Sequence, residues 1–426
     1  MTTPPDALAA LRAAAAHHEA SRERLHLLPS ENGLSLAARL PHLTEAAVRY
    51  ACPGPESGGE NCVWPGRQDL VAVEQGAAVL LGAQLGAAYV NLKPVSGISA
   101  LTVALSALAG AWQTVFNWAE RDGGHGSTRF IGTHWGLRMK DLPFDPVTLT
   151  LDLDRLADRI GEGPPALVYL DVFTCLFPVV LRGLREVVGE QTAIHYDASH
   201  ALGLIAGGEF QNPLAEGADS LGGSADKTYP GPHKGLLATN DSAIAARLDE
   251  HASHFASHHH SADVAALAVA AAEMDEHGTV YARRTVANAR RLAAALAERG
   301  FIVCGEHRGF TACHQLWIDI AALMDAQTAS RLLFEAGVVV EAIPIPRICA
   351  PAGLRLGVQE VSWAEMGTAE MNEFAEVFTA VLRDGQDPAT AAKRTRALLE
   401  AHRPDSAADQ VLRGGLAATG GDRGAS

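Results

Sequence analysis

Residues 194–200 read Ile-His-Tyr-Asp-Ala-Ser-His, and residues 224–232 read Ser-Ala-Asp-Lys-Thr-Tyr-Pro-Gly-Pro. The first stretch is an apolar strand that ends in Asp197, with His200 three positions later. Ligands bind at the carboxyl ends of strands in an α/β sheet, so Asp197 is placed where a carboxylate can meet a protonated ring nitrogen. A helix N-cap followed by a packed histidine would also explain this stretch.

Lys227 stands in the second stretch, between small and polar residues and just before a Pro-Gly turn. Irregular backbone of this kind can hold a lysine away from a helix face, as a Schiff-base lysine requires. Alone, Lys227 would be read as a surface charge. Its position about thirty residues after Asp197 matches the pair that pyridoxal 5'-phosphate requires, a lysine imine and an aspartate at the pyridinium nitrogen.

The phosphate of such a cofactor requires a helix N-terminus with small residues. Ser96, Gly97 and Ser99 open a helical pattern over 100–113, where backbone N–H groups, hydroxyls and the helix dipole favour an anion. This pattern by itself is also typical of an ordinary helix cap. Since the three signals follow the order that one cofactor needs, we expect these residues to bind the phosphate.

Strands and helices alternate along the chain, which predicts an α/β fold. Helical spacing covers 6–25, 70–85, 100–113 and 181–188, and apolar strands are expected at 87–92, 165–170 and 193–196. This order implies a largely parallel sheet that is covered on both faces. A long helix over 261–299 precedes strands at 301–304, 315–320 and 337–342, which predict a smaller α/β domain.

Four segments are expected from this organisation. They are an N-terminal helical arm over 1–48, a large cofactor-binding domain over 49–265, a small C-terminal domain over 266–385, and a C-terminal helix with a flexible tail over 386–426.

Composition excludes several classes of protein. The 426 residues include 34 Lys and Arg against 49 Asp and Glu, a net charge of −15 that disfavours nucleic-acid binding. No apolar run reaches the ~18 residues that would span a bilayer, and the N-terminus lacks the features of a signal peptide. The six cysteines form no CxxC pair and are expected to be reduced. A cytoplasmic location is therefore expected.

The run Tyr196–Asp219, YDASHALGLIAGGEFQNPLAEGAD, closely resembles serine hydroxymethyltransferase, a fold-type I pyridoxal-phosphate enzyme. Further matches fall in order: LLPSENGLS at 27–35, VNLKPVSGISA at 90–100, GGHGS at 123–127, ADKTYPGP at 225–232 and APAGLRLG at 350–357. The resemblance covers roughly 27–382. It implies an aspartate-aminotransferase-like fold, with a large mixed or parallel sheet domain and the smaller domain described above.

The resemblance also implies roles for residues around the cofactor. Lys227 would form the imine, and Asp197 would pair with the pyridinium nitrogen. His125 would stack on the ring, His200 would lie beside it, and Cys175 would touch it.

Further roles implied by the resemblance concern the substrate. Arg355 and Ser30 would bind the substrate carboxylate, a task that suits a forked guanidinium. Tyr50 would reach the substrate across a dimer interface. His125 and Tyr50 are both candidates for moving the proton of the β-hydroxyl group.

Departures from the family are concentrated where folate chemistry would occur. The family has a glutamate and paired tyrosines in the loop after Tyr50, whereas residues 50–59 here read YACPGPESGG, and Glu56 differs in register. Asp226 replaces the histidine before the imine lysine, and 360–363 read Glu-Val-Ser-Trp in place of Thr-Arg-Arg-Gly. These departures put folate use in question while the pyridoxal-phosphate residues remain.

The histidines near residue 258 permit two interpretations. His258, His259 and His260 replace a Gly-Gly-Pro segment of the family, with His251 and His254 just before them. A metal cluster is one interpretation. Because no cysteine or carboxylate set completes a recognisable spacing, interface or cofactor-adjacent histidines are favoured and no metal is expected.

The sequence therefore predicts a pyridoxal-phosphate enzyme that makes or breaks the Cα–Cβ bond of a β-hydroxy-α-amino acid through a glycine quinonoid. Folate-independent relatives of this kind are the threonine aldolases and the threonine transaldolases of antibiotic biosynthesis. An ordinary serine or α-methylserine hydroxymethyltransferase that uses tetrahydrofolate is the alternative. A non-catalytic paralogue is disfavoured because Lys227, Asp197 and Arg355 are all present. The expected partners are an amino acid, an aldehyde and a second copy of the chain, in a homodimer or a dimer of dimers with shared active sites.

Overall fold

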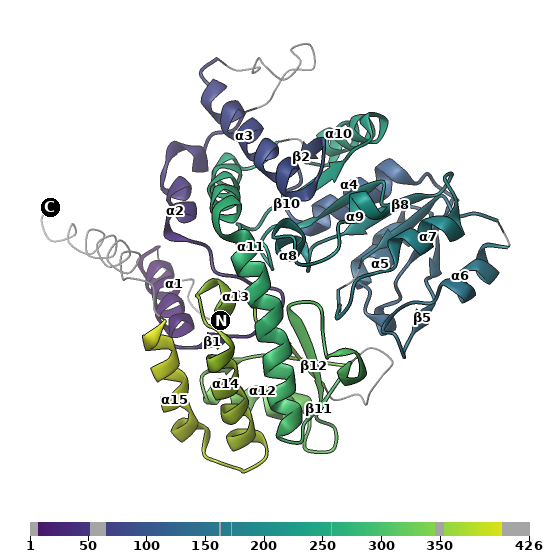
Figure 1. The fold of residues 1–426 in the computed structure, drawn as a ribbon. Helices are drawn as coiled ribbons and strands as arrows, with labels where there is room; N and C mark the ends of the chain where they lie inside the picture. Colours follow the sequence, from purple (N-terminus) through teal and green to yellow (C-terminus); the bar gives the residue numbers. More distant parts are fainter. Residues whose placement is uncertain are drawn as a thin grey trace, which may run out of the picture.

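The strand that ends in Asp197 lies in the middle of a seven-stranded sheet (Figure 1). The protein is represented by a computed structural model that describes residues 7–51, 65–161, 163–171, 173–256, 258–345 and 353–402. The expected loop after Tyr50, the expected tail, and Cys52, Cys62 and Cys349 all lie outside these residues.

The large sheet is mixed, with one strand opposed to its neighbours. Its order is β2 (Tyr89–Asn91), β10 (Gly235–Thr239), β9 (Ser220–Ser224), β8 (Ala193–Asp197), β7 (Leu167–Leu170), β3 (Thr114–Asn117) and β4 (Arg138–Asp141). Strand β10 is antiparallel to both β2 and β9, and the remaining pairs are parallel. The carboxyl ends of β7, β8 and β9 therefore meet at one edge of the sheet.

Helices cover both faces of this sheet, as the alternation predicts. Val168 and Leu170 of β7 pack into the core that also holds residues of α3 (Gln68–Leu85), α6 (Leu153–Ile160), α7 (Leu181–Val188) and α8 (Leu202–Ala206). Leu167 and Tyr169 of the same strand pack on the other face, with α4 (Gly97–Leu108) and α10 (Ser242–Ala256). Helix α5 (Gly126–His134) contacts α4, and α9 (Pro213–Glu216) contacts β9. Alternate residues of a strand face opposite layers, so β7 contributes to both cores.

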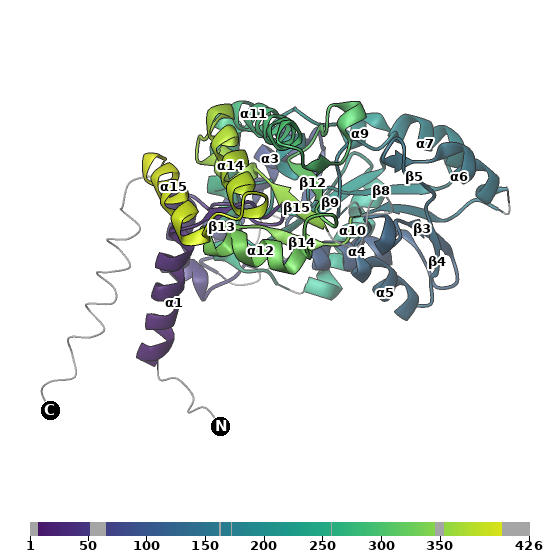
Figure 2. The same cartoon turned by 90° about the horizontal axis from the view of Figure 1, so that it is seen from below.

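The smaller domain contains an antiparallel sheet in place of the parallel pairing that α/β alternation favours. Its order is β11 (Ile302–Val303), β12 (Gln315–Asp319), β15 (Gly353–Gly357) and β14 (Glu341–Ile343). Its helices are α12 (Ala326–Glu335), α13 (Gln359–Trp363), α14 (Thr368–Leu382) and α15 (Pro388–Ala401). Figure 2 shows this sheet and its helices on one side of the molecule and the large sheet on the other.

One helix joins the two halves. Helix α11 (Ser261–Glu298) contributes Val264, Leu267 and Met274 to the core of the large sheet and Leu292 and Leu296 to the core of the small one. The expected boundary between residues 265 and 266 therefore falls within a continuous helix.

The N-terminal and C-terminal segments both pack against the small domain. After α1 (Ala7–Arg22), strand β1 (Leu25–His26) pairs in parallel with β13 (Val338–Val339). Helix α2 (Leu36–Arg39) and the short turns Leu40–Leu43 and Glu45–Ala47 then contact α11. Helix α15 contacts α12 and α14, where Thr395 donates a hydrogen bond to the carbonyl of Ala336. The four segment boundaries stay a prediction.

Short elements complete the described chain. They are β5 (Phe144–Asp145), β6 (Thr150–Leu151), and the 3-10 turns Glu120–Asp122 and Glu306–Arg308. Within the described ranges, no helix combines the length and apolar character needed to cross a bilayer.

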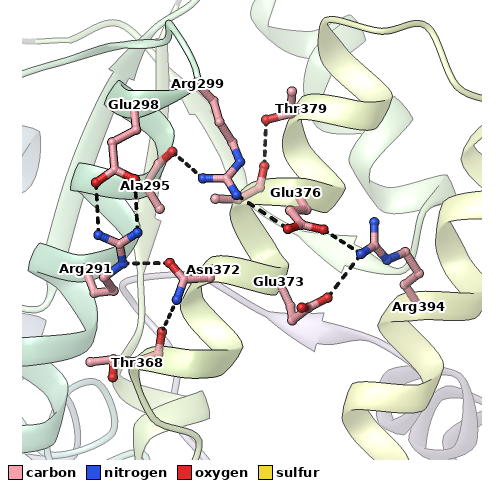
Figure 3. A network of polar contacts seen from close by, with 11 residues as sticks. Arg291, Ala295, Glu298, Arg299, Thr368, Asn372, Glu373, Glu376, Thr379 and Arg394 are labelled. Atoms are coloured by element: carbon pink, nitrogen blue, oxygen red, sulfur yellow. Dashed lines mark hydrogen bonds and ion pairs between the residues drawn. The ribbon is translucent and has the colours of Figure 1, made fainter.

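Polar contacts connect α11, α14 and α15 at the surface (Figure 3). Both amino groups of Arg291 donate to Glu298 at 3.0 Å, and its Nε donates to Asn372 at 2.6 Å. Arg394 of α15 donates to Glu376 at 2.5 Å and to Glu373 at 3.2 Å. Arg394 and both glutamates are between 40% and 46% exposed, so water screens these ion pairs and their contribution is small.

The small domain should therefore depend on its apolar core more than on these ion pairs. Phe378 is fully buried in α14, and Phe378→Ala should lower the free energy of unfolding by about 3–5 kcal/mol. Arg394→Ala should cost about 0.2–1 kcal/mol, and less at high salt. Urea unfolding of both variants measures the difference, and similar losses in the two would contradict this view of the domain.

Candidate active site

A pocket opens at the carboxyl ends of β7 and β8, beside the first turn of α4. It encloses about 420 Å³ of space that is partly open to solvent. Of the residues named from the sequence, five line it: Gly97, His125, Asp197, His200 and Lys227. Sequence reasoning did not assign the six other lining residues, which are Ile98, Leu101, Asp171, Phe173, Ser199 and Ser224.

Asp197 is held by a donor on each carboxylate oxygen. The hydroxyl of Tyr169 donates to Oδ2 at 3.1 Å, and the backbone N–H of Ser199 donates to Oδ1 at 2.9 Å. Burial, and secondarily the charge of Asp197, raise the pKa of Tyr169 well above its usual value, so its hydroxyl stays a donor. The carboxylate is thus fixed in one orientation at the edge of the pocket.

Lys227 lies in the connection after β9, and its chain segment is anchored. The carbonyl of Thr228 accepts hydrogen bonds from the Tyr281 hydroxyl at 2.6 Å and from Asn32 Nδ2 at 3.2 Å. Lys227 Nζ lies 3.1 Å from His200 Nε2. Burial lowers the pKa of Lys227, which increases the share of the unprotonated amine that can attack a carbonyl.

Lys234 is the other lysine near the Pro-Gly turn, and it points elsewhere. Its Nζ donates to the carbonyl of Pro94 at 2.8 Å, and the side chain is 1% exposed. Burial lowers its pKa to about 8, but it does not line the pocket.

The first turn of α4 is packed too closely for any residue but glycine at position 97. A Cβ on Gly97 would lie 2.2 Å from the Ser224 hydroxyl and 3.4 Å from that of Ser199. Ser96 caps the helix by accepting the Ser99 N–H at 3.1 Å, and neither serine lines the pocket. A helix N-terminus, two hydroxyls and a missing side chain provide a cradle that fits a phosphate.

His125 caps the N-terminus of α5 at the pocket wall. Its Nδ1 accepts the backbone N–H of Ser127 at 3.3 Å, and the backbone N–H of His125 donates to Asp171 Oδ2 at 3.2 Å. Burial, followed by the charge of Lys227, lowers the pKa of His125, so the ring is neutral. With Nδ1 accepting, the proton lies on Nε2.

Burial shifts the pKa values of His200 and Asp171 in opposite directions. Desolvation, followed by the charge of Lys227, lowers the pKa of His200 well below its usual value. Asp171 directly follows β7, and Asp197 ends β8. Because Leu170 pairs with Tyr196 in parallel register, the two aspartates occupy neighbouring positions. Burial raises the pKa of Asp171 well above its usual value, and the charge of Asp197 raises it further.

Arg355 lies in the small domain, directly behind Phe173 of the pocket wall. It lies on β15, is fully buried, and donates through Nη1 to the carbonyl of Phe173 at 2.8 Å. Its guanidinium carbon lies 3.9 Å from the centre of the Phe173 ring. Phe173 lines the pocket, so one residue of the large domain separates Arg355 from the space beside Lys227.

Besides Ser96, Ser99 and Arg355, three further named residues lie outside the lining of the pocket. Ser30 lies in a segment whose backbone contacts the small domain. The carbonyl of Pro29 is 3.2 Å from His314 Nε2, and the carbonyl of Glu31 accepts a hydrogen bond from Gln359 at 2.6 Å. The ring of Tyr50 stacks on His258 at 4.1 Å.

Cys175 is the third, and its expected contact with the cofactor ring needs correction. Its Sγ lies 3.3 Å from the carbonyl of Phe177, in a buried apolar cluster that also contains Leu204, Val286 and Cys313. Phe173, two residues earlier, is the residue that lines the pocket. Cys175 therefore packs behind the wall.

The residues that sequence reasoning missed differ in how clearly the sequence indicates them. Tyr169 lies in the strand expected over 165–170 and Asp171 directly follows that strand, so the reasoning that selected Asp197 could have selected Asp171. Phe173 follows in a loop with no local motif. Glu341, which pairs with Arg355, is brought there only by the pairing of β14 with β15.

The histidine segment pairs with nearby carboxylates. His259 Nε2 lies 3.1 Å from Glu74, and His260 lies 3.3 Å from Asp263, which also contacts His42 at 2.8 Å. Within the part of the chain that the structure describes, no group of three or more His, Cys, Asp or Glu side chains could hold a metal ion.

Comparison with known proteins gives consistent matches along the whole fold. The family model described as serine hydroxymethyltransferase matches residues 12–378. Serine hydroxymethyltransferase of Korarchaeum cryptofilum is 36% identical over 393 residues, which cover 87% of this chain and 90% of that protein. An L-threonine:uridine-5'-aldehyde transaldolase of a Streptomyces species is 34% identical over 391 residues, covering 90% and 91%.

A solved structure extends the match to the tertiary level. The L-threonine transaldolase from Pseudomonas fluorescens, in its internal aldimine state, superposes with a TM-score of 0.86 at 28% identity. The match covers 96% of this chain and 95% of that one. The cofactor is pyridoxal 5'-phosphate. The buried amine of Lys227, the carboxylate of Asp197 and the helix N-terminus at Gly97 fit this cofactor.

Borohydride reduction of the holoenzyme should label Lys227 and leave Lys234 unlabelled, because only Lys227 lines the pocket. Peptide mapping identifies the modified residue. Lys227→Ala should lose the reducible linkage, and Lys234→Ala, the matched control, should keep it. A label on Lys234 would contradict the assignment.

Asp197→Asn should keep part of the cofactor binding but slow turnover by about 100- to 1000-fold, since a neutral amide does not hold a ring nitrogen protonated. Turnover per bound cofactor is the quantity to compare with the unmodified enzyme. A value near that of the parent protein would exclude Asp197 as the pyridinium partner.

Proposed function

The chain belongs to the serine hydroxymethyltransferase family, and within it we propose a folate-independent enzyme of the threonine transaldolase type. It is a fold-type I, pyridoxal-phosphate-dependent transferase. The proposed reaction cleaves the Cα–Cβ bond of threonine or a similar β-hydroxy-α-amino acid, releases its aldehyde, and joins the remaining glycine unit to a second aldehyde.

The observation that carries this choice is the sequence of residues 50–59. Hydroxymethyltransferases and transaldolases are about equally similar to this chain, at 36% and 34% identity. The stretch after Tyr50 lacks the glutamate and paired tyrosines that the resemblance associates with folate-dependent transfer. Lys227, Asp197 and Arg355, which would act on the amino acid alone, are all present. Loss of the one-carbon residues with retention of the amino-acid residues supports a change of second substrate.

Pyridoxal phosphate, when bound, supplies an electron sink for the pair released as the Cα–Cβ bond breaks. Lys227 would hold it covalently, Asp197 would keep its ring nitrogen protonated, and the turn at Gly97 would bind its phosphate. The orientation of Asp197 is set before substrate arrives, because Tyr169 and Ser199 occupy its two oxygens. Such preorganisation avoids reorientation during the reaction.

Several groups around this pocket can move protons. Lys227 Nζ and His200 Nε2 are 3.1 Å apart, and burial lowers the pKa of each. His125 presents an N–H on Nε2, so it would donate to a substrate oxygen before it could accept a proton. His125 and Tyr50 stay the proposed proton carriers for the β-hydroxyl group.

We also propose a homodimer or a dimer of dimers that shares active sites. Tyr50 is 36% exposed, stacks on His258, and does not line the pocket of its own chain. Its position is consistent with a role in the site of a second copy. Residues 36–48, next to it, expose Leu40, Leu43 and Val48. A cytoplasmic location stays a prediction from the sequence.

The purified holoenzyme should release acetaldehyde from threonine and, with an added aromatic aldehyde, form the corresponding β-hydroxy-α-amino acid. Tetrahydrofolate should neither bind tightly nor accelerate the conversion of serine to glycine. Coupled acetaldehyde detection, product mass and titration calorimetry measure these outcomes, with Lys227→Ala as the inactive control. Micromolar binding of tetrahydrofolate with folate-stimulated serine cleavage would instead make this an ordinary hydroxymethyltransferase.

A further inference from the structure

Arg355 forms an ion pair with the carboxylate of Glu341. Oε2 of Glu341 lies 2.6 Å from Arg355 Nε and 2.5 Å from Nη2. The two residues are directly opposed in the antiparallel pair of β14 and β15, so the contact follows from the register of the sheet. One edge of the guanidinium is therefore occupied by the protein itself.

The two partners differ in their access to water. The Arg355 side chain is 0% exposed, whereas that of Glu341 is 29% exposed. Arg355 is also held from the other side by the carbonyl and the ring of Phe173. Glu341 is therefore the partner that can turn toward solvent, while the guanidinium stays in place.

A buried guanidinium needs a counter-ion. An uncompensated charge in the protein interior is strongly destabilising, and an ion pair removes most of that cost. In the structure, Glu341 is the counter-ion of Arg355. When a second carboxylate arrives, the two anions repel each other on a single cation, so the newcomer gains less than it would from an unpaired arginine.

We propose that Glu341 is a resident counter-ion of Arg355 that the carboxylate of the amino-acid substrate displaces. This rests on the proposed function, which assigns Arg355 to that carboxylate. Glu341 keeps the buried arginine compensated in the substrate-free enzyme and weakens the binding of the amino acid by the cost of its displacement. Because the carboxylate is bound in the ground state and in the transition state alike, this cost raises KM and leaves kcat unchanged.

Glu341→Gln tests the proposal, because the amide oxygen can still accept from Nε while the competing charge is removed. The dissociation constant of the holoenzyme for glycine should fall by about tenfold. The melting temperature without ligand should fall as well, and the increase caused by saturating glycine should be larger than in the parent enzyme. Calorimetry and thermal unfolding give the two readouts.

Two controls accompany this variant. Glu341→Asp keeps the charge and should bind glycine nearly as the parent does. Glu335→Gln removes an equal charge from the exposed end of α12 and should change neither readout. Weaker glycine binding in Glu341→Gln, with recovery in Glu341→Asp, would overturn the proposal, since Glu341 would then only position Arg355.

Arg355→Gln separates this inference from the function on which it rests. Glycine should no longer stabilise that variant. If glycine protects Arg355→Gln as well as it protects the parent enzyme, the carboxylate binds elsewhere, and both proposals fall. If glycine binding requires Arg355 but is not tightened by Glu341→Gln, only the role of Glu341 is refuted.

Discussion

Charge compensation between buried side chains is the constraint on which this active site depends. Lys227 and Arg355 are both removed from water, and each would be costly to bury alone. Asp197 and Glu341 supply the opposing charges. The charge of each raises the pKa of Lys227, whereas burial, the larger effect, lowers it. The pocket thereby combines an amine that can lose its proton with an arginine that keeps its charge.

This balance requires both domains. Asp197 and Lys227 lie at the end of β8 and after β9, whereas Arg355 and Glu341 belong to the antiparallel sheet of the small domain. Phe173 connects the two groups, because it lines the pocket and also contacts the guanidinium through its carbonyl and its ring. Helix α11 runs through both cores, so the relative position of the sheets is set by continuous packing along one element.

The chain therefore separates what its family shares from what distinguishes its members. Over most of its length the chain is similar to both hydroxymethyltransferases and transaldolases. The proposed change of second substrate rests on the sequence, in which residues 50–59 and the histidines at 258–260 depart from the family pattern. Similarity along the whole chain does not distinguish these activities, because proteins of one fold can differ in the few residues that meet the substrate.

The sequence by itself determined the alternating elements, the strand that ends in Asp197, and the order in which the phosphate turn, the aspartate and Lys227 occur. These features are local: periodicity, turn residues and short motifs are encoded by neighbours in the chain. Only the tertiary structure decided that Lys234 turns to Pro94, that Cys175 lies behind the wall, that Asp171 stands beside Asp197, and that Glu341 occupies Arg355. Each of these depends on strand register or packing between segments far apart in the sequence, and no local pattern specifies such contacts.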